Sequence, residues 1–190
     1  MKAVRSYPVA LAIAACMAFP GCMPKMTVEE MKAMMPQRPP ELDKLDAFVG
    51  KWSFEGQANM ACLDAPLATS GTGETRWDDS KWFVVGNATF KMHGFDDMHG
   101  HETWTYDAHS KKYRSTWVDS MGSTGTGTAT HDDRTNSWTM RAVSHGSCGK
   151  TTMKGTMRIV DDNTMEWCMQ EYAMGGLMKT MEMCATSKRQ

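Results

Sequence analysis

The segment Lys179-Thr180-Met181-Glu182-Met183-Cys184-Ala185-Thr186-Ser187-Lys188 closes a chain that is built of short alternating stretches. Within it, Met181, Met183 and Ala185 alternate with more polar neighbours. A period of two places successive side chains on opposite faces of a β-strand. The segment therefore predicts a strand with one face toward a core.

The same period recurs along the chain after Gly50. Ten strand-like runs are predicted, at residues 51–59, 69–77, 82–91, 100–107, 112–119, 125–130, 137–145, 152–160, 165–172 and 177–187. Turn residues such as Asp161-Asp162-Asn163 and Gly175-Gly176 separate the runs. The spacing is typical of an all-β fold, a single antiparallel up-and-down β-barrel of about ten strands. Closure of the sheet would remove its exposed edges.

The alternation also assigns the two faces of the barrel wall. Tyr113, Ser115 and Trp117 share one face of their run, and Met165, Trp167 and Met169 share one face of another. The interior is therefore expected to be lined by methionine and tryptophan, and a barrel of this size can enclose a ligand cavity. The candidate cavity residues are Trp104, Tyr113, Trp117, Trp138, Met157, Trp167 and Met169.

Three segments together resemble a known family: residues 45–52 (Leu-Asp-Ala-Phe-Val-Gly-Lys-Trp), residues 106–122, and the closing segment. They are similar to domain-of-unknown-function family 1579, over residues 41–188. That family looks like the calycins, so the resemblance implies a lipocalin-like barrel and no particular activity. Gly50-Lys51-Trp52 resembles the Gly-x-Trp start of lipocalins, in which the tryptophan closes the bottom of the barrel.

The N-terminus has the pattern of an export signal. Lys2 and Arg5 precede a short apolar stretch at residues 9–19, which is too short to span a bilayer. Phe19-Pro20-Gly21-Cys22 resembles a bacterial lipobox, so Cys22 is the predicted lipidated residue. The alternatives are Cys16, or secretion with cleavage near Ala18. We expect an exported protein in the bacterial periplasm, an outer-membrane lipoprotein because Met23 is not aspartate.

These features divide the chain into three parts: a lipoprotein signal peptide at residues 1–21, a tether at 22–40 and the barrel domain at 41–190. In the tether, Thr27 and Glu30 form the pattern of a capping box for a short helix through Met35. Residues 41–48 predict a second short helical turn that plugs one end of the barrel.

The charge of the chain argues against some partners. Its 190 residues include 21 basic and 22 acidic side chains, a formal net charge of −1. Removal of residues 1–21 leaves 19 basic and 22 acidic side chains, a charge of −3. No block of like charge indicates binding to nucleic acid or to an anionic surface. We therefore expect the lipid anchor to be the contact with the membrane.

Four cysteines remain when Cys16 and Cys22 are set aside, and an even number in an exported chain predicts disulfides. A hairpin folded about Gly176 sets Cys168 opposite Cys184. Cys62 and Cys148 each follow an odd-numbered strand, so their loops emerge at the same end of the barrel. The expected bridges are Cys168–Cys184 and Cys62–Cys148.

Possible metal ligands gather in the loop after the third predicted strand: Met92, His93, Met98, His99 and His101. Met121 follows the fifth predicted strand and His145 ends the seventh, so an antiparallel barrel places both at the same end as this loop. Thioether and imidazole groups suit copper. Non-covalent haem, with His101 or His145 as the axial ligand, is a further hypothesis. The alternative is a composition bias, because the chain contains 20 methionines.

No catalytic motif is present, since the Gly-rich stretch at 122–127 is followed by a strand and no nucleophile elbow occurs. The leading hypothesis is a lipid-anchored barrel that binds a small apolar ligand in its interior. A copper- or haem-binding envelope protein, an enzyme of unknown reaction and a ligand-free scaffold are the alternatives. A buried carboxylate with a perturbed pKa would favour the enzyme.

Overall fold

The computed structural model describes residues 25–147 and 149–190, in two units, 1–37 and 38–190. The predicted signal peptide, Cys22 and Cys148 lie outside the described residues. In the first unit, α2 (Val28–Ala33) begins after Thr27. The capping box is confirmed, because the Glu30 N–H donates to Thr27 Oγ1 and the Thr27 N–H donates to Glu30 Oε2. Within the described residues, no helix is long and apolar enough to cross a membrane.

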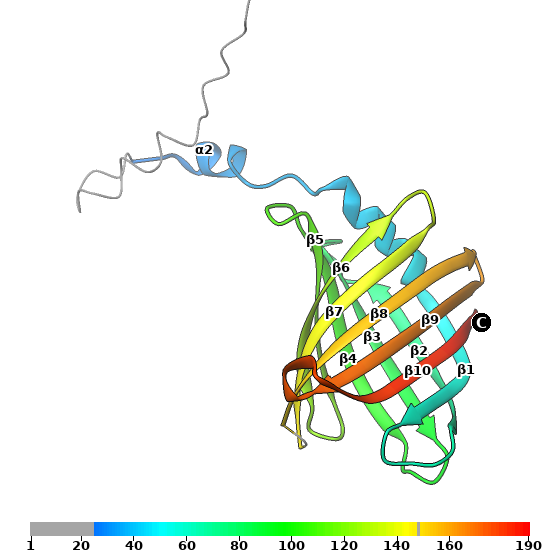
Figure 1. Cartoon of the computed structure of the whole chain (residues 1–190). Coiled ribbons are helices and arrows are strands. Elements are labelled where there is room, and N and C mark those ends of the chain that lie inside the picture. The colour runs from blue at the N-terminus through cyan, green and yellow to red at the C-terminus, as the bar shows by residue number, and fades with distance from the viewer. Residues whose placement is uncertain (1–24, 148) are drawn as a thin grey trace, which may run out of the picture. The chain divides into compact units, whose positions relative to one another are not determined.

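The second unit is a closed barrel of ten antiparallel strands, in which each strand pairs with its neighbours in sequence and β1 pairs with β10 (Figure 1). The predicted fold is confirmed, and the strand ends differ from the predicted ends by at most three residues. The strands are β1 (Gly50–Met60), β2 (Leu67–Trp77), β3 (Phe83–Met92), β4 (Met98–Asp107), β5 (Lys112–Asp119), β6 (Thr124–Asp132), β7 (Ser137–Gly146), β8 (Gly149–Asp161), β9 (Thr164–Ala173) and β10 (Met178–Arg189).

A 3-10 helix, η2 (Pro40–Phe48), plugs the end of the barrel where the odd-numbered strands begin. It is the light-blue segment that leads into β1 in Figure 1. Its side chains Leu42 and Leu45 are fully buried, in a core that also contains Tyr113 and Trp138. The Tyr113 hydroxyl donates to the Glu41 carbonyl at 2.8 Å. Burial of two leucines on the barrel core explains why this short helix is ordered.

Trp52 and Arg189 close the seam between the first and last strands at this plugged end. The Trp52 indole N–H donates to the Phe48 carbonyl at 3.0 Å. The Arg189 guanidinium lies 4.2 Å from the centre of the Trp52 ring and donates to the carbonyls of Val49 and Ala47. Trp52 thus occupies the barrel-bottom position that the lipocalin resemblance implied.

The other end of the barrel, called here the far end, is formed by the loops that follow β1, β3, β5, β7 and β9. A second 3-10 turn, η3 (Met174–Gly176), lies in the last of these loops. Since η2 packs at the opposite end, the far end is the natural entrance to the interior.

The predicted Cys168–Cys184 disulfide is present. The two residues lie directly opposite each other on β9 and β10, with their Cα atoms 4.1 Å apart. They alternate with the inward-facing Met169 and Met183, so the bridge lies on the outer wall. Cys62 is exposed and forms no disulfide with another described cysteine. Because Cys148 lies outside the described residues, the Cys62–Cys148 bridge stays a prediction.

Candidate functional site

Ala58, Thr69 and Thr151 are buried at inward positions nearer the far end, and a larger buried cluster packs toward the plugged end. The buried cluster there consists of Leu42, Leu45, Val84, Tyr113, Ala129 and Trp138. The Phe48 ring lies tilted against the Trp138 ring, with ring centres 4.9 Å apart. The cluster leaves out the inward-facing residues nearer the far end, and these include a glutamate.

Glu102 faces the inside of the barrel from the middle of β4. Its position alternates with the outward-facing His101 and Thr103. A methyl group added to Gly86, the buried neighbour of Glu102 on β3, would lie 3.1 Å from Glu102 Cγ. The indole N–H of Trp104 donates to Glu102 Oε2 at 3.0 Å. The register and both contacts place the carboxyl group on the inner face.

Although it points inward, Glu102 remains exposed. Because the strand register turns the carboxyl group inward, the surface that it exposes faces the inside of the barrel. An inward-facing side chain that remains exposed lies beside space that neighbouring side chains do not fill. The interior at this level therefore contains space that reaches the Glu102 side chain.

Burial shifts the ionisation of this carboxyl group. Loss of solvation raises the pKa of Glu102 above its ordinary value, and burial outweighs the opposing effects of the Trp104 hydrogen bond and of His101. The neutral acid is stabilised because the interior solvates a carboxylate less well than water does. A carboxyl group with a perturbed pKa inside a cavity is a candidate functional group.

Glu102 belongs to one row of cross-strand neighbours on the inner face of the barrel. Thr75 pairs with Gly86, Gly86 with Glu102, and Glu102 with Trp117 on β5. The Trp117 indole lies over Gly125, where any added Cβ would clash with the ring. The carboxyl group therefore has an indole on the neighbouring strand and a second indole, that of Trp104, two residues along its own strand.

Aromatic and thioether side chains from β1, β3, β9 and β10 line another part of the inner wall. Phe54 on β1 contacts Phe90 at 5.0 Å and Trp167 at 5.6 Å between ring centres. Met169 and Met183 face each other across β9 and β10. This wall offers apolar, polarisable surface, which suits a hydrophobic ligand.

The predicted cavity residues all fall on the inner face, in two groups. Tyr113 and Trp138 are buried in the cluster against η2, and Trp104 and Met157 pack against that cluster. Trp117, Trp167 and Met169 lie outside it. The residues free to meet a ligand are therefore Trp117, Trp167 and Met169, together with the indole edge of Trp104.

The structure separates the predicted metal ligands between the two faces of the wall. His99 and His101 alternate with the inward Met98 and lie outside, where His99 Nδ1 contacts Thr89 Oγ1 at 3.1 Å and His101 Nδ1 contacts Asn87 Oδ1 at 2.8 Å. Met92 and Met98 are partly buried, whereas His93, Met121 and His145 are exposed. No group of three His, Cys, Asp or Glu side chains suited to a metal occurs among the described residues. Copper binding at this loop stays a prediction.

The haem hypothesis requires a histidine on the inner face. His101 lies on the outer face, and His145 is exposed near the end of β7. The inward-facing histidine is His131, but it lies at the plugged end, tilted against the Trp138 ring and hydrogen-bonded to Asp133 and Asn136. Neither His101 nor His145 is brought into the interior.

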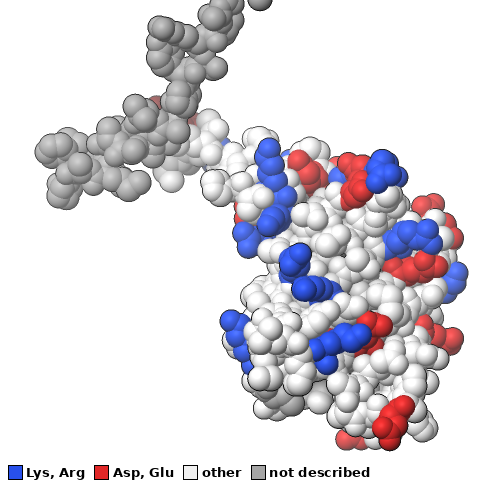
Figure 2. Space-filling model, viewed as in Figure 1, with Lys and Arg blue, Asp and Glu red and all other residues white. Residues whose placement is uncertain are grey.

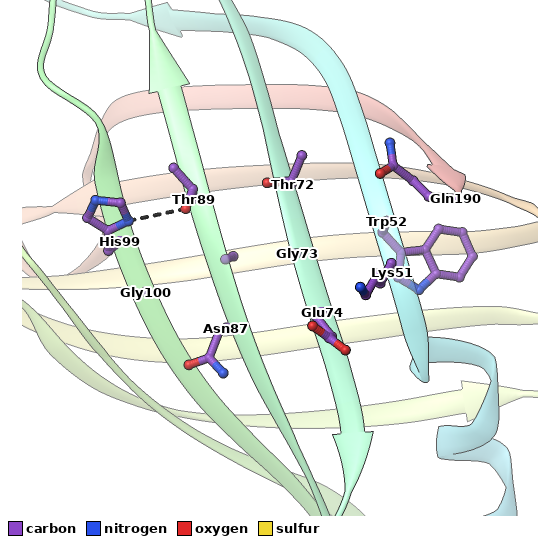
Figure 3. A pocket seen from close by; sticks show the side chains of 11 residues that line it. Lys51, Trp52, Thr72, Gly73, Glu74, Asn87, Thr89, His99, Gly100 and Gln190 are labelled. Atoms are coloured by element: carbon purple, nitrogen blue, oxygen red, sulfur yellow. Dashed lines mark hydrogen bonds between the residues drawn. The ribbon is translucent and has the colours of Figure 1, made fainter.

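A shallow pocket of about 550 Å³ lies on the outer wall, over β1 to β4 (Figure 3). Most of its side chains are polar and come from the outward positions of these strands, and they include Lys51, Glu74, Asn87 and His99. The strand backbones at Gly73 and Gly100 form its floor. Because the pocket is wide and polar, it is a less suitable site for an apolar molecule than the interior.

Comparison with known proteins agrees with this architecture. The family model described as a protein of unknown function, DUF1579, matches residues 37–187. The chain belongs to this family. The barrel of this DUF1579 protein is similar to that of Rv2717c from M. tuberculosis, with a TM-score of 0.62 and 11% identity, covering 81% of this chain and 99% of the other.

The S-type phycobiliprotein lyase CPES of Guillardia theta is also similar, with a TM-score of 0.55 and 10% identity, covering 87% and 98% of the two chains. At these identities, the likeness shows the fold alone. A comparison with curated proteins finds no match for this DUF1579 chain.

Sequence reasoning missed Glu102 in this DUF1579 member. The signal was present, because Gly100, Glu102 and Trp104 share one face of β4 and Trp104 was already placed inside. The inward glycines were a second signal. Positions without a side chain occur on the inner faces of several strands, and they leave room beside the large residues: Gly71, Gly73, Gly86, Gly100, Gly125, Gly127 and Gly155.

Proposed function

We propose that this protein is an exported, lipid-anchored binding module that holds a small, largely apolar ligand inside its barrel. One observation carries the proposal: Glu102 faces the interior and yet remains exposed, so the interior contains accessible space. The methionine and aromatic lining provides apolar contact, and Glu102 provides a single polar group to orient the ligand. Export and anchoring rest on the sequence pattern around Cys22.

Binding of N-phenylnaphthylamine, a neutral dye that fluoresces in apolar sites, tests the proposal. We expect saturable binding to the mature protein, with energy transfer from tryptophan to the dye. Gly100→Leu should weaken this binding by about tenfold or more, because a Cβ at the inward Gly100 would meet only the Val118 carbonyl oxygen, at 3.9 Å, so the larger side chain would occupy space that the ligand needs.

The matched control is Thr126→Leu, which adds the same bulk to an exposed position on the outer face of β6. It should bind the dye like the wild type. If both variants bind equally well, the dye lies on the surface and the proposed interior site is wrong.

A second candidate function is catalysis, favoured by the raised pKa of Glu102. Among the described residues, the side-chain hydrogen bond to Glu102 comes from Trp104, which can neither accept nor relay a proton. A general acid without a partner base or nucleophile suits ligand binding better than it suits a reaction. The binding module is therefore the preferred function.

A further inference from the structure

The interior around Glu102 is acidic. Glu171 on β9 also alternates onto the inner face, where Thr180 donates to its carboxyl group at 3.0 Å. His131 lies on the inner face of β6 at the plugged end. Of the lysines and arginines in the described strands, Arg189 alone falls on the inner face. It is held at the plugged end by backbone carbonyls. A ligand in this space therefore meets carboxyl groups without a basic side chain to pair them.

Aromatic rings surround the Glu102 carboxyl group. Trp117 lies directly opposite it on β5, and Trp104 bonds to it through the indole edge. The faces of tryptophan rings attract cations, and the attraction strengthens where water is excluded. A carboxyl group between two indoles, in an apolar enclosure, has the composition of a site for an organic cation.

Building on the interior site proposed above, we propose that the ligand is an organic cation: a quaternary or protonated amine carried on an apolar body. The ammonium group faces Glu102 and the ring of Trp117. The apolar body extends along the aromatic and thioether wall formed by Phe54, Trp167 and Met169.

Ionisation of Glu102 is coupled to binding of such a ligand. The neighbouring strands present Thr75, Gly86 and Trp117 to the carboxyl group, all uncharged, while His101 acts from the outer face. Glu171 and Asp119 are the other inward carboxyl groups, and the Asp119 carboxylate accepts the backbone N–H groups of Met121 and Ser123. Burial favours the protonated acid, and a cation favours the carboxylate. Binding of the cation therefore releases a proton, and the affinity rises as pH rises through the pKa of Glu102.

Three ligands with one apolar body test the proposal: phenylbutyl trimethylammonium, phenylbutanol and phenylbutyrate. The quaternary ammonium keeps its charge at every pH, so any pH dependence reports the protein. Calorimetry between about pH 4 and pH 8 should show that the cation binds about tenfold tighter than the alcohol at the upper end. The carboxylate should bind weakest. Repeating the titration in buffers of different ionisation enthalpy measures the released proton.

Glu102→Gln keeps the shape of the side chain and removes its charge. We expect this variant to bind the cation and the alcohol equally, without pH dependence or proton release. The matched control is Glu74→Gln, which removes an exposed carboxylate from the outer pocket. It should retain the preference of the wild type for the cation.

The outcomes separate the two proposals. If the alcohol and the neutral dye bind inside the barrel but the cation binds no tighter than the alcohol, the interior site is supported and the cation proposal is overturned. If the preference for the cation survives in Glu102→Gln and is lost in Glu74→Gln, the cation binds at the outer pocket and the assignment to Glu102 is wrong. If none of these molecules binds, the proposed function itself fails.

Discussion

At the residue scale, Glu102 is the position where the chain departs most from what stability alone would favour. The other inward residues of β4 are Met98, Gly100, Trp104 and Tyr106. An acid among them must lose water on folding, and this costs free energy whenever the group is ionised. The cost is understandable if the carboxyl group serves a ligand.

Glu102→Gln should therefore change how stability depends on pH. Because the pKa of Glu102 is raised in the folded state, the folded protein binds this proton more tightly than the unfolded chain does. The contribution of the protonated acid is complete below the ordinary glutamate pKa and is lost as pH rises through the raised pKa. We expect the variant to gain stability over the wild type as pH increases, measured by urea unfolding at about pH 4 and pH 8.

Asp107 provides the opposite case and an internal comparison. Hydrogen bonds from Ser110, together with the Arg114 guanidinium, lower the pKa of the Asp107 carboxyl group. Asp107→Asn should be less stable than the wild type near neutral pH, where the carboxylate is ionised. The difference in stability should shrink in acid, as the wild-type carboxyl group becomes protonated. If the stabilities of Glu102→Gln and Asp107→Asn, each relative to the wild type, changed in the same direction with pH, the inward placement of Glu102 would be contradicted.

At the scale of single elements, η2 depends on its two leucines. Leu42 and Leu45 are both 0% exposed, in the buried cluster that they form with Tyr113 and Trp138 at the plugged end of the barrel. Leu45→Ala should lower the free energy of unfolding by about 2–5 kcal/mol, as expected for a fully buried leucine.

Asp43→Ala is the control in the same helix. Asp43 is exposed and pairs with Arg38, and surface ion pairs contribute about 1 kcal/mol or less. Chemical unfolding followed by tryptophan fluorescence measures both variants. Equal losses for the two variants would show that η2 does not act as a plug.

The β9–β10 hairpin depends on its outer disulfide. Cys168 and Cys184 are separated by 16 positions in the sequence, and a bridge over a loop of that size stabilises a protein by about 3 kcal/mol. The double variant Cys168→Ser with Cys184→Ser should show a loss of this order. Cys62→Ser, at an exposed position, should unfold like the wild type, provided that Cys62 remains unpaired.

At the scale of the whole molecule, the barrel wall carries charges of both signs. Figure 2 shows lysine, arginine, aspartate and glutamate interspersed on the face in view. Several pair across strands, as Arg158 does with Glu166 at 2.8 Å. No field of one sign on this face indicates a surface for nucleic acid.

Anchoring also belongs to this scale. If Cys22 is the acylated residue, Cys22→Ser should release the protein from the membrane fraction of its host or block its processing. Cell fractionation followed by mass spectrometry of the N-terminal peptide measures both effects. Release by Cys16→Ser instead would show that the other cysteine carries the lipid.

The sequence by itself determined the barrel. Ten alternating runs with turn residues between them predicted the strands, and the hairpin centred on Gly176 predicted the Cys168–Cys184 pair. Thr27 and Glu30 likewise predicted the capped helix. These features depend on local periodicity and on the geometry of neighbouring strands, and both are encoded within a few residues.

Only the tertiary structure decided which inward positions are packed and which are accessible. Tyr113 and Trp117 lie on the same face of β5, but Tyr113 is buried against η2 whereas Trp117 lies toward accessible space. The period of two distinguishes inside from outside, but not one depth in the barrel from another. Depth depends on how far the plug reaches and where glycines on other strands leave room. For that reason the candidate site, with Glu102 at its centre, emerged only when ten distant segments were brought around one axis.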